Sequence, residues 1–202
     1  TGQRVAEASV QLGRKYQLEM GGKNPLVVLD DADLDTAVDC ALNGAFFSTG
    51  QRCTASSRLI VTEGIHDRFV DALKTRIAAT HVGNALEPES VIGPVASASQ
   101  LEQNLSYVEI GTSEGATLAI GGERLERPTQ GHYMAPALLV GCSADMRTSR
   151  EEIFGPVASV IQVKDYDEAL AQANDTERTA GQLDPLKATS WNAPALANRS
   201  LG

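Results

Sequence analysis

The sequence has few aromatic residues, few cysteines and no long apolar run, and each shortage narrows the classes of protein that fit it. Aromatic residues make up 4% of the 202 residues. The chain has 17 basic and 26 acidic side chains, so its formal net charge is −9 at pH 7. An acidic chain with so few aromatics is poorly suited to bind nucleic acid or anionic lipid through its net field. No apolar run approaches the roughly 20 residues that a membrane-spanning helix needs. We therefore expect neither a nucleic-acid partner nor a membrane partner.

The three cysteines, Cys40, Cys53 and Cys142, indicate neither a disulfide framework nor a zinc site. Their number is odd, and no two of them have Cys-x-x-Cys spacing. This usage fits a reducing compartment, and the first eleven residues lack the apolar core of a signal peptide. The prediction is a cytoplasmic protein without a metal site.

What remains is the composition of a globular chain, with 42% hydrophobic and 21% charged residues. These values exclude a wholly disordered or low-complexity chain. Apolar runs typical of strands alternate with stretches of helical periodicity, and strands that alternate with helices predict an α/β domain with a mostly parallel sheet. Strands are expected at 25–29, 58–62, 118–120, 137–140 and 157–163, and helices at the amino terminus, at 33–47, and after Thr62, Ser97 and Asp165.

Cys53 follows a predicted helix and a glycine-containing turn. Small polar side chains surround it in the segment 48–57 and would leave room for a substrate. Exposed backbone N–H groups and Arg52 would favour the thiolate, which is the reactive form of cysteine. The alternative is a packing residue, which is our interpretation of Cys40 and Cys142. Local sequence leaves both interpretations of Cys53 open.

Glu19 stands just before two glycines and a buried strand. The glycines permit close approach of a ligand or another backbone, while the alternative is a solvated acid in a tight turn. A strand of roughly 13 Å and a returning helix of roughly 22 Å would bring Cys53 back toward Glu19 in a right-handed unit. A thiol and a carboxylate in one cleft suit a two-step acyl transfer, with the thiol as nucleophile and the carboxylate as base for water.

A third segment, 150–157, has two acids before a short bend and a strand, and alone it would indicate only a surface charge pair. Together, the segments 18–23, 47–53 and 151–157 resemble, in that order, the signatures of the aldehyde dehydrogenase superfamily. The resemblance covers residues 1 to about 177. Within the superfamily, the run 21–69 most resembles the bacterial α-ketoglutarate semialdehyde (2,5-dioxopentanoate) dehydrogenases.

The resemblance implies an NAD(P)-dependent oxidation of an aldehyde to a carboxylic acid. Cys53 would attack the aldehyde carbon, with its own backbone N–H helping to hold the oxyanion. Loss of hydride to the cofactor would leave a thioester, which Glu19 would help to hydrolyse by activating water. The substrate would be α-ketoglutarate semialdehyde, or another aldehyde such as succinate semialdehyde.

The resemblance also implies which residues meet the cofactor, NAD or NADP. Glu152 would bind the nicotinamide ribose hydroxyls, and Phe154 would contact the nicotinamide end. Met20 and Gly21 would line the nicotinamide pocket through their backbone groups.

Because subunits of this superfamily are much longer, the resemblance implies an internal fragment of a homo-oligomeric parent. Residues 1–18 would be a remnant of the Rossmann-like NAD(P)-binding domain, and 19–177 a truncated catalytic domain. The tail 178–202 has no sustained period and does not resemble the family, so we expect loose order there, with a short helix near 193–197. A reading-frame shift or a vector-derived end is our hypothesis for this tail. The fragment itself is expected to be inactive, and a non-catalytic remnant that binds intact relatives is the third interpretation.

Overall fold

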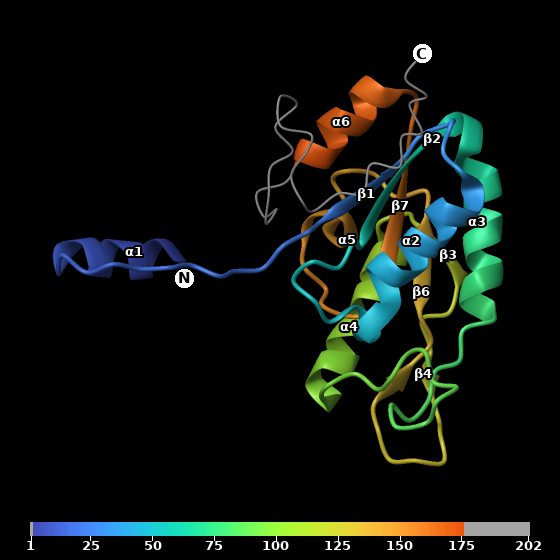
Figure 1. The fold of residues 1–202 in the computed structure, drawn as a ribbon, viewed down its shortest axis with the longest axis horizontal. Coiled ribbons are helices and arrows are strands. Elements are labelled where there is room, and N and C mark those ends of the chain that lie inside the picture. The colour runs from blue at the N-terminus through green and yellow to red at the C-terminus, as the bar shows by residue number, and fades with distance from the viewer. Residues whose placement is uncertain (1, 176–202) are drawn as a thin grey trace.

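Five strands form one twisted sheet at the centre of the molecule (Figure 1). The computed structural model describes residues 2–175, so the predicted tail 178–202, with its expected helix, lies outside the described residues. Four neighbouring strands are parallel and the last is antiparallel, which confirms the predicted α/β fold with a mostly parallel sheet. The strands follow the order β1 (Pro25–Val28), β2 (Arg58–Thr62), β7 (Val157–Val163), β6 (Ala137–Val140) and β3 (Thr117–Ile120).

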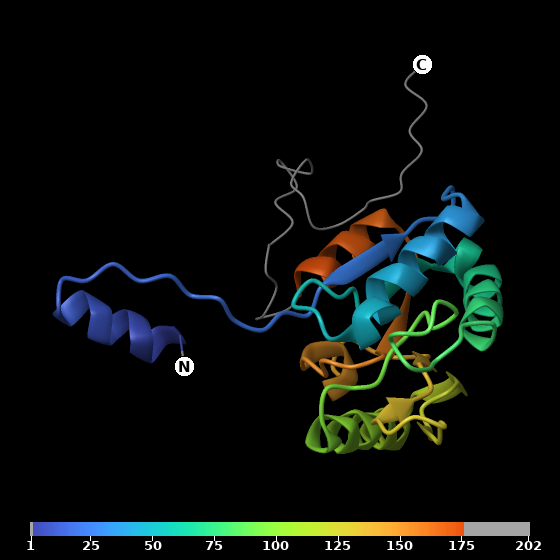
Figure 2. The ribbon, with the colours of Figure 1, turned by 60° about the horizontal axis from the view of Figure 1, so that its bottom comes forward.

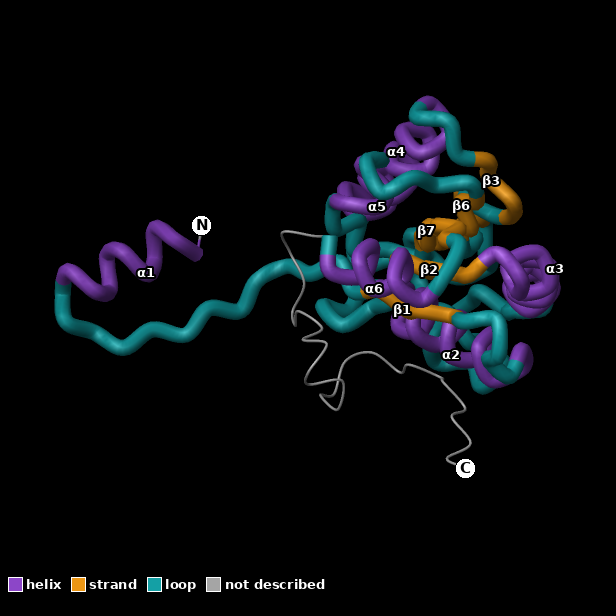
Figure 3. Tube along the Cα trace, turned by 90° about the horizontal axis from the view of Figure 1, so that it is seen from above, coloured by secondary structure: helices purple, strands orange, loops and turns teal. Residues whose placement is uncertain are grey.

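Helices cover both faces of this sheet, as the view from above shows (Figure 3). Alternation along β2 divides the core: Leu59 and Val61 belong to one buried cluster, and Ile60 belongs to the other. Successive side chains of a strand point to opposite faces, so a run that is apolar throughout needs cover on both sides. One face carries α2 (Leu34–Phe46) and α3 (Glu63–Ala78), and the other carries α4 (Ala98–Ser113), α5 (Arg147–Arg150) and α6 (Tyr166–Asn174).

Three helices begin at the residues that the sequence predicts. The side chains of Asp33, Ser97 and Asp165 each accept a hydrogen bond from the backbone N–H three residues later, at 2.9, 3.2 and 2.9 Å. Such caps satisfy N–H groups that have no partner within the helix. The caps fix where α2, α4 and α6 start.

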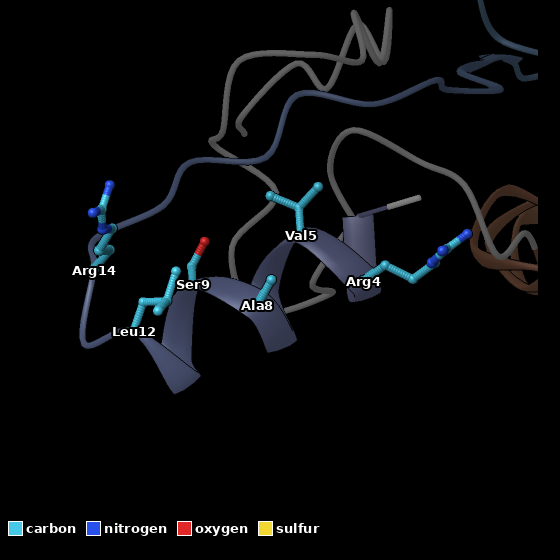
Figure 4. A pocket seen from close by; sticks show the side chains of 6 residues that line it. All are labelled: Arg4, Val5, Ala8, Ser9, Leu12 and Arg14. Carbon is cyan, nitrogen blue, oxygen red and sulfur yellow. The ribbon is translucent and has the colours of Figure 1, made fainter.

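Helix α1 (Gly2–Gln11) stands apart from the sheet at the end of an extended stretch, residues 12–24 (Figures 1 and 2). The stretch runs back along the helix, so that Leu18 and Met20 lie beside Gly2. A shallow hollow of about 480 Å³ lies on α1 and the residues just after it (Figure 4). It is lined by Arg4, Val5, Ala8, Ser9, Leu12 and Arg14.

Three short elements complete the described chain. The pair β4 (Arg124–Leu125) and β5 (Tyr133–Met134) forms a small antiparallel sheet, and a single helical turn, η1 (Phe47–Gly50), follows α2. None of the helices in residues 2–175 is long and apolar enough to cross a membrane.

Candidate active site

The segment from Gly22 to Asn24 joins the three stretches that sequence analysis singled out. The side-chain amide of Asn24 donates to the carbonyl of Cys53 at 2.7 Å, and the backbone N–H of Gly22 donates to Oε1 of Glu152 at 3.2 Å. The return of α2 toward the start of β1 therefore brings the Cys53 carbonyl to Asn24, which lies five residues along the chain from Glu19. All these contacts lie at the amino ends of β1, β2 and β7.

Two glycines make this close approach possible. A Cβ on Gly22 would stand 3.1 Å from the carbonyl oxygen of Cys53, and a Cβ on Gly21 would collide with the carboxylate of Glu152. Glycine is the residue for positions where another group must approach the backbone this closely. The sequence therefore places Gly21 and Gly22 where a side chain would push the Glu152 and Cys53 loops away.

The turn that carries Cys53 is strained. Ser48 and Thr49 have φ values of 54° and 60°, in the left-handed region that residues with a Cβ rarely enter. Such strain persists where the surroundings hold it. The hydroxyl of Thr49 donates to the carbonyl of Gly93 at 3.2 Å, and the side chain of Gln51 accepts from the backbone of Ala96 at 3.0 Å. The segment before α4 thus anchors the turn, which leaves Cys53 exposed.

Arg52 supports this turn rather than the thiol. Its guanidinium donates to the carbonyls of Asn43 and Gly44 at 2.7 and 2.8 Å and lies 5.5 Å from the centre of the Phe47 ring. A cation is favourable near the carboxyl end of a helix. The expectation that Arg52 favours the Cys53 thiolate finds no support in these contacts, because they direct its charge to α2.

Glu152 and Phe154 lie on a loop that two glutamines of α4 hold in place. Phe154 has a φ of 58° and leaves 38% of its surface exposed. The side chains of Gln100 and Gln103 donate to the carbonyl of Ile153 at 2.9 and 3.2 Å. Sequence analysis missed this role, because amides spaced along a helix look like ordinary solvated positions.

The Glu152 loop also packs against the Cys53 turn. Gly50, with a φ of 65°, lies so close to the carbonyl of Gly155 that a Cβ would collide with it. A Cβ on Gly155 would in turn collide with the buried amide of Asn104 in α4. The Cys53 turn, the Glu152 loop and α4 therefore form one packed unit.

Glu19 and Met20 lie on the exposed stretch that leads to this unit. Met20 is 60% exposed, and the side chain of Glu19 makes no hydrogen bond or ion pair with any residue in 2–175. The structure thus brings together Gly21, Cys53 and Glu152, and it leaves Glu19 on the adjoining extended stretch without a hydrogen bond to Cys53.

Two basic side chains, Lys23 and Arg58, are buried at the segment from Gly22 to Asn24. Arg58 donates from Nε to the carbonyl of Lys23 at 3.1 Å, and from its two Nη atoms to Gln172 and Ala173 at the end of α6, both at 3.1 Å. Burial lowers the pKa of Arg58 to about 10. Burial, followed by the charge of Arg58, lowers the pKa of Lys23 to about 7. In the described part of the chain, no three His, Cys, Asp or Glu residues gather so that they could hold a metal ion.

Comparison with known proteins decides the family. The sequence model of the aldehyde dehydrogenase family matches residues 1–181. The chain belongs to the aldehyde dehydrogenase family. This confirms the family that the three segments predicted.

Relatives with this family's fold include enzymes for more than one aldehyde. The chain is 47% identical to an α-ketoglutaric semialdehyde dehydrogenase of Bacillus subtilis over 87% of its length, and 42% identical to a betaine aldehyde dehydrogenase of Mesorhizobium japonicum over 88%. A crystal structure of Staphylococcus aureus betaine aldehyde dehydrogenase with NAD+ matches 87% of the chain with a TM-score of 0.82 and 38% identity. The chain spans 36%, 37% and 35% of the length of these three aldehyde dehydrogenases.

Proposed function

We propose that the described chain supplies the nucleophile, the base and a nicotinamide-ribose contact for the NAD(P)-dependent oxidation of an aldehyde. The observation that carries this proposal is the pair of hydrogen bonds from Asn24 to the Cys53 carbonyl and from Gly22 to the Glu152 carboxylate, which attach the Cys53 backbone and the Glu152 side chain to one short segment. A site of this kind needs its reacting groups held in a fixed relation before substrate arrives.

Cys53 performs the first step. Its thiolate attacks the aldehyde carbon and forms a tetrahedral thiohemiacetal, and the backbone N–H of Cys53 donates to the oxyanion. The exposed position of Cys53 gives an aldehyde access, and the anchored turn at Ser48 and Thr49 holds the backbone that leads to it. Collapse of this intermediate expels the hydrogen of the aldehyde carbon with its electron pair.

Residues around Glu152 fit the nicotinamide end of a dinucleotide. The Glu152 carboxylate is half-buried and fixed by the Gly22 N–H, so its remaining acceptor positions suit the two hydroxyls of a ribose. Gly21 offers backbone without a side chain, and Phe154, two residues after Glu152, offers a partly exposed apolar ring. NAD+ or NADP+, when bound, accepts the hydride.

Glu19 completes the reaction. It takes a proton from water, which attacks the Cys53 thioester and releases the carboxylic acid and the thiolate. The position of Glu19, next to the glycines that touch both loops, supports this role. The balance is one aldehyde, one NAD(P)+ and one water consumed, and one acid, one NAD(P)H and one proton released.

The substrate that we propose is α-ketoglutarate semialdehyde, on the basis of the 47% identity with the Bacillus subtilis enzyme of that name. Betaine aldehyde is a second candidate, because relatives of that name are 42% and 44% identical. We also propose that the whole parent enzyme is a homo-oligomer. Its assembly and its choice of substrate both depend on parts of the protein that the described residues do not include.

The test uses a chimera in which residues 2–175 replace the matching segment of the Bacillus subtilis enzyme. We expect the chimera to reduce NAD(P)+ with α-ketoglutarate semialdehyde, Cys53→Ser to abolish the reduction, and Cys40→Ser to retain it. The 202-residue chain alone is expected to give no reduction. A Cys53→Ser chimera as active as its parent would refute the proposed nucleophile, and the same assay with betaine aldehyde and succinate semialdehyde ranks the substrates.

A further inference from the structure

Glu151, the residue just before Glu152, is held by side chains of two helices. Arg147 in α5 donates from Nε to Oε1 of Glu151 at 2.8 Å and from Nη2 to Oε2 at 2.9 Å. The hydroxyl of Tyr107 in α4 also donates to Oε2. The Arg147 guanidinium lies 5.5 Å from the centre of the Tyr107 ring, so the three side chains close on one another. Two parallel bonds to one carboxylate fix its orientation as well as its position. We call Tyr107, Arg147 and Glu151 the Glu151 clamp.

The clamp holds the backbone that leads into Glu152. Glu151 has extended backbone, with a φ of −96° and a ψ of 145°, and in extended backbone successive side chains point to opposite sides. Because the Glu151 side chain is turned to α4 and α5, the Glu152 side chain is turned the other way. There the backbone N–H of Gly22 donates to Oε1 of Glu152 at 3.2 Å. The Glu152 carboxylate is therefore aimed by the contacts of its neighbour as well as by its own.

The tyrosine of the clamp belongs to a polar row on α4. Four polar side chains have the spacing that places them on one face of this helix: Gln100, Gln103, Asn104 and Tyr107. The two glutamines donate to the carbonyl of Ile153 at 2.9 and 3.2 Å. A Cβ on Gly155 would collide with the amide of Asn104. The row therefore meets the alternate positions 151, 153 and 155, and Glu152 lies between two of them.

We propose that Glu151 is a positioning residue for Glu152, and that Tyr107 and Arg147 hold it in that role. The clamp fixes the direction in which the Glu152 carboxylate leaves its loop, so that its remaining acceptor positions are set before a ribose arrives. The side chains of Arg147 and Glu151 are 50% and 42% exposed, and ion pairs this exposed add little to stability. The contribution of the clamp is therefore to geometry. Its effect on cofactor binding rests on the proposed function, whereas its effect on the mobility of residues 151–155 does not.

The mobility is measured by amide hydrogen exchange on the 202-residue chain. Tyr107→Phe removes one hydroxyl, and we expect the amides of 151–155 to exchange about fivefold faster, the factor that corresponds to one hydrogen bond. The amides of β2 should keep their rates. Tyr166→Phe makes the same chemical change at an exposed tyrosine and should alter neither region. Unchanged exchange in 151–155, or an equal acceleration in β2, would overturn the proposal.

The consequence for the cofactor is measured in the chimera. We expect Tyr107→Phe to raise the KM for NAD(P)+ about fivefold, with the KM for aldehyde and kcat much less changed. Arg147→Met should act in the same direction, and Arg147→Lys, which keeps the charge but not the two parallel bonds, should restore part of the loss. An unchanged KM for NAD(P)+ in Tyr107→Phe, or equal rises in both KM values, would overturn the positioning role. A chimera with no activity at all would count against the proposed function, and the exchange rates would still decide whether the clamp holds the loop.

Discussion

At the scale of single residues, Asn24 has the most direct connection to the nucleophile. Its side chain is buried and donates to the Cys53 carbonyl at 2.7 Å, across 29 residues of sequence. A hydrogen bond of this kind contributes about 1 kcal/mol, and the carbonyl that loses its partner adds to the cost. Asn24 directly follows the segment 18–23, but the sequence indicated no role for it, because nothing local shows which carbonyl a side-chain amide will reach.

We therefore expect Asn24→Ala to lower the free energy of unfolding by about 1 kcal/mol and to loosen the peptide that carries Cys53. Urea unfolding measures the first effect, and the rate of Cys53 alkylation by iodoacetamide measures the second. Asn43→Ala is the matched control, because Asn43 donates to a carbonyl one helical turn back on an exposed surface. Equal losses of unfolding free energy in both variants would show that the Asn24 contact stabilises the chain no more than an exposed hydrogen bond does.

Lys23 makes stability depend on pH in a predictable direction. Its pKa is about 7 in the folded chain and 10.5 without the fold, so between these values the unfolded chain binds more protons. The free energy of unfolding therefore rises with pH from about 7 upward, by as much as about 1.4 kcal/mol for each pH unit. Burial raises the pKa of Cys142, which acts in the opposite direction at alkaline pH, so the comparison is best made below its usual range.

The measurement is urea unfolding at several pH values between about 7 and about 8, below the unperturbed cysteine pKa of about 8.5. The parent chain should gain stability across this interval, and Lys23→Met should not. Lys164→Met, at an exposed lysine, should follow the parent. Parallel curves for Lys23→Met and the parent would mean that Lys23 keeps an ordinary pKa in the folded state.

At the scale of elements, local signals predicted the strands and helix starts well but missed the shortest pieces. Helix α5 has four residues, too few for a 3.6-residue period to show, and β4 and β5 have two each. Ser97 and Gln100 have the spacing of a capping box, but only half of it forms: Ser97 accepts from the backbone of Gln100, while the Gln100 side chain reaches Ile153 instead of returning to Ser97. A tertiary contact has overridden the local pattern there.

The contact of α4 with the Glu152 loop gives a prediction of its own. We expect the double variant Gln100→Ala/Gln103→Ala to free the Ile153 carbonyl and let the strained Phe154 relax, because two hydrogen bonds that hold this loop are lost. In the chimera, the KM for NAD(P)+ should rise more than the KM for aldehyde. Ser106→Ala, whose hydroxyl bonds only within α4, is the control. Equal rises in both KM values would indicate general damage to the site rather than a loosened loop.

At the scale of the whole molecule, the fold class was predictable and the assembly of the site was only partly so. Apolar runs and helical periods alternate along residues 25–174, and this alternation predicts an α/β fold with a mostly parallel sheet. The contact of Gly22 with Glu152 spans 130 residues, and no local pattern joins such positions. The resemblance to a family linked Cys53 with Glu152, whereas Arg58 and the α4 glutamines emerge only from packing.

The isolation of α1 leads to the last prediction. Within α1 only Gly2 is buried, and the helix meets the following stretch at Leu18 and Met20 rather than the sheet (Figure 2). If residues 1–18 form a unit separate from the rest of the described chain, deleting them should change the free energy of unfolding of the rest by less than about 1 kcal/mol, since no core packing is lost.

Deleting 166–175 is the contrasting variant. It removes the α6 carbonyls that Arg58 binds and the buried Ala169 and Ala173, and it should prevent cooperative unfolding. Loss of the cooperative transition in the first deletion would show instead that α1 and the sheet fold as one unit.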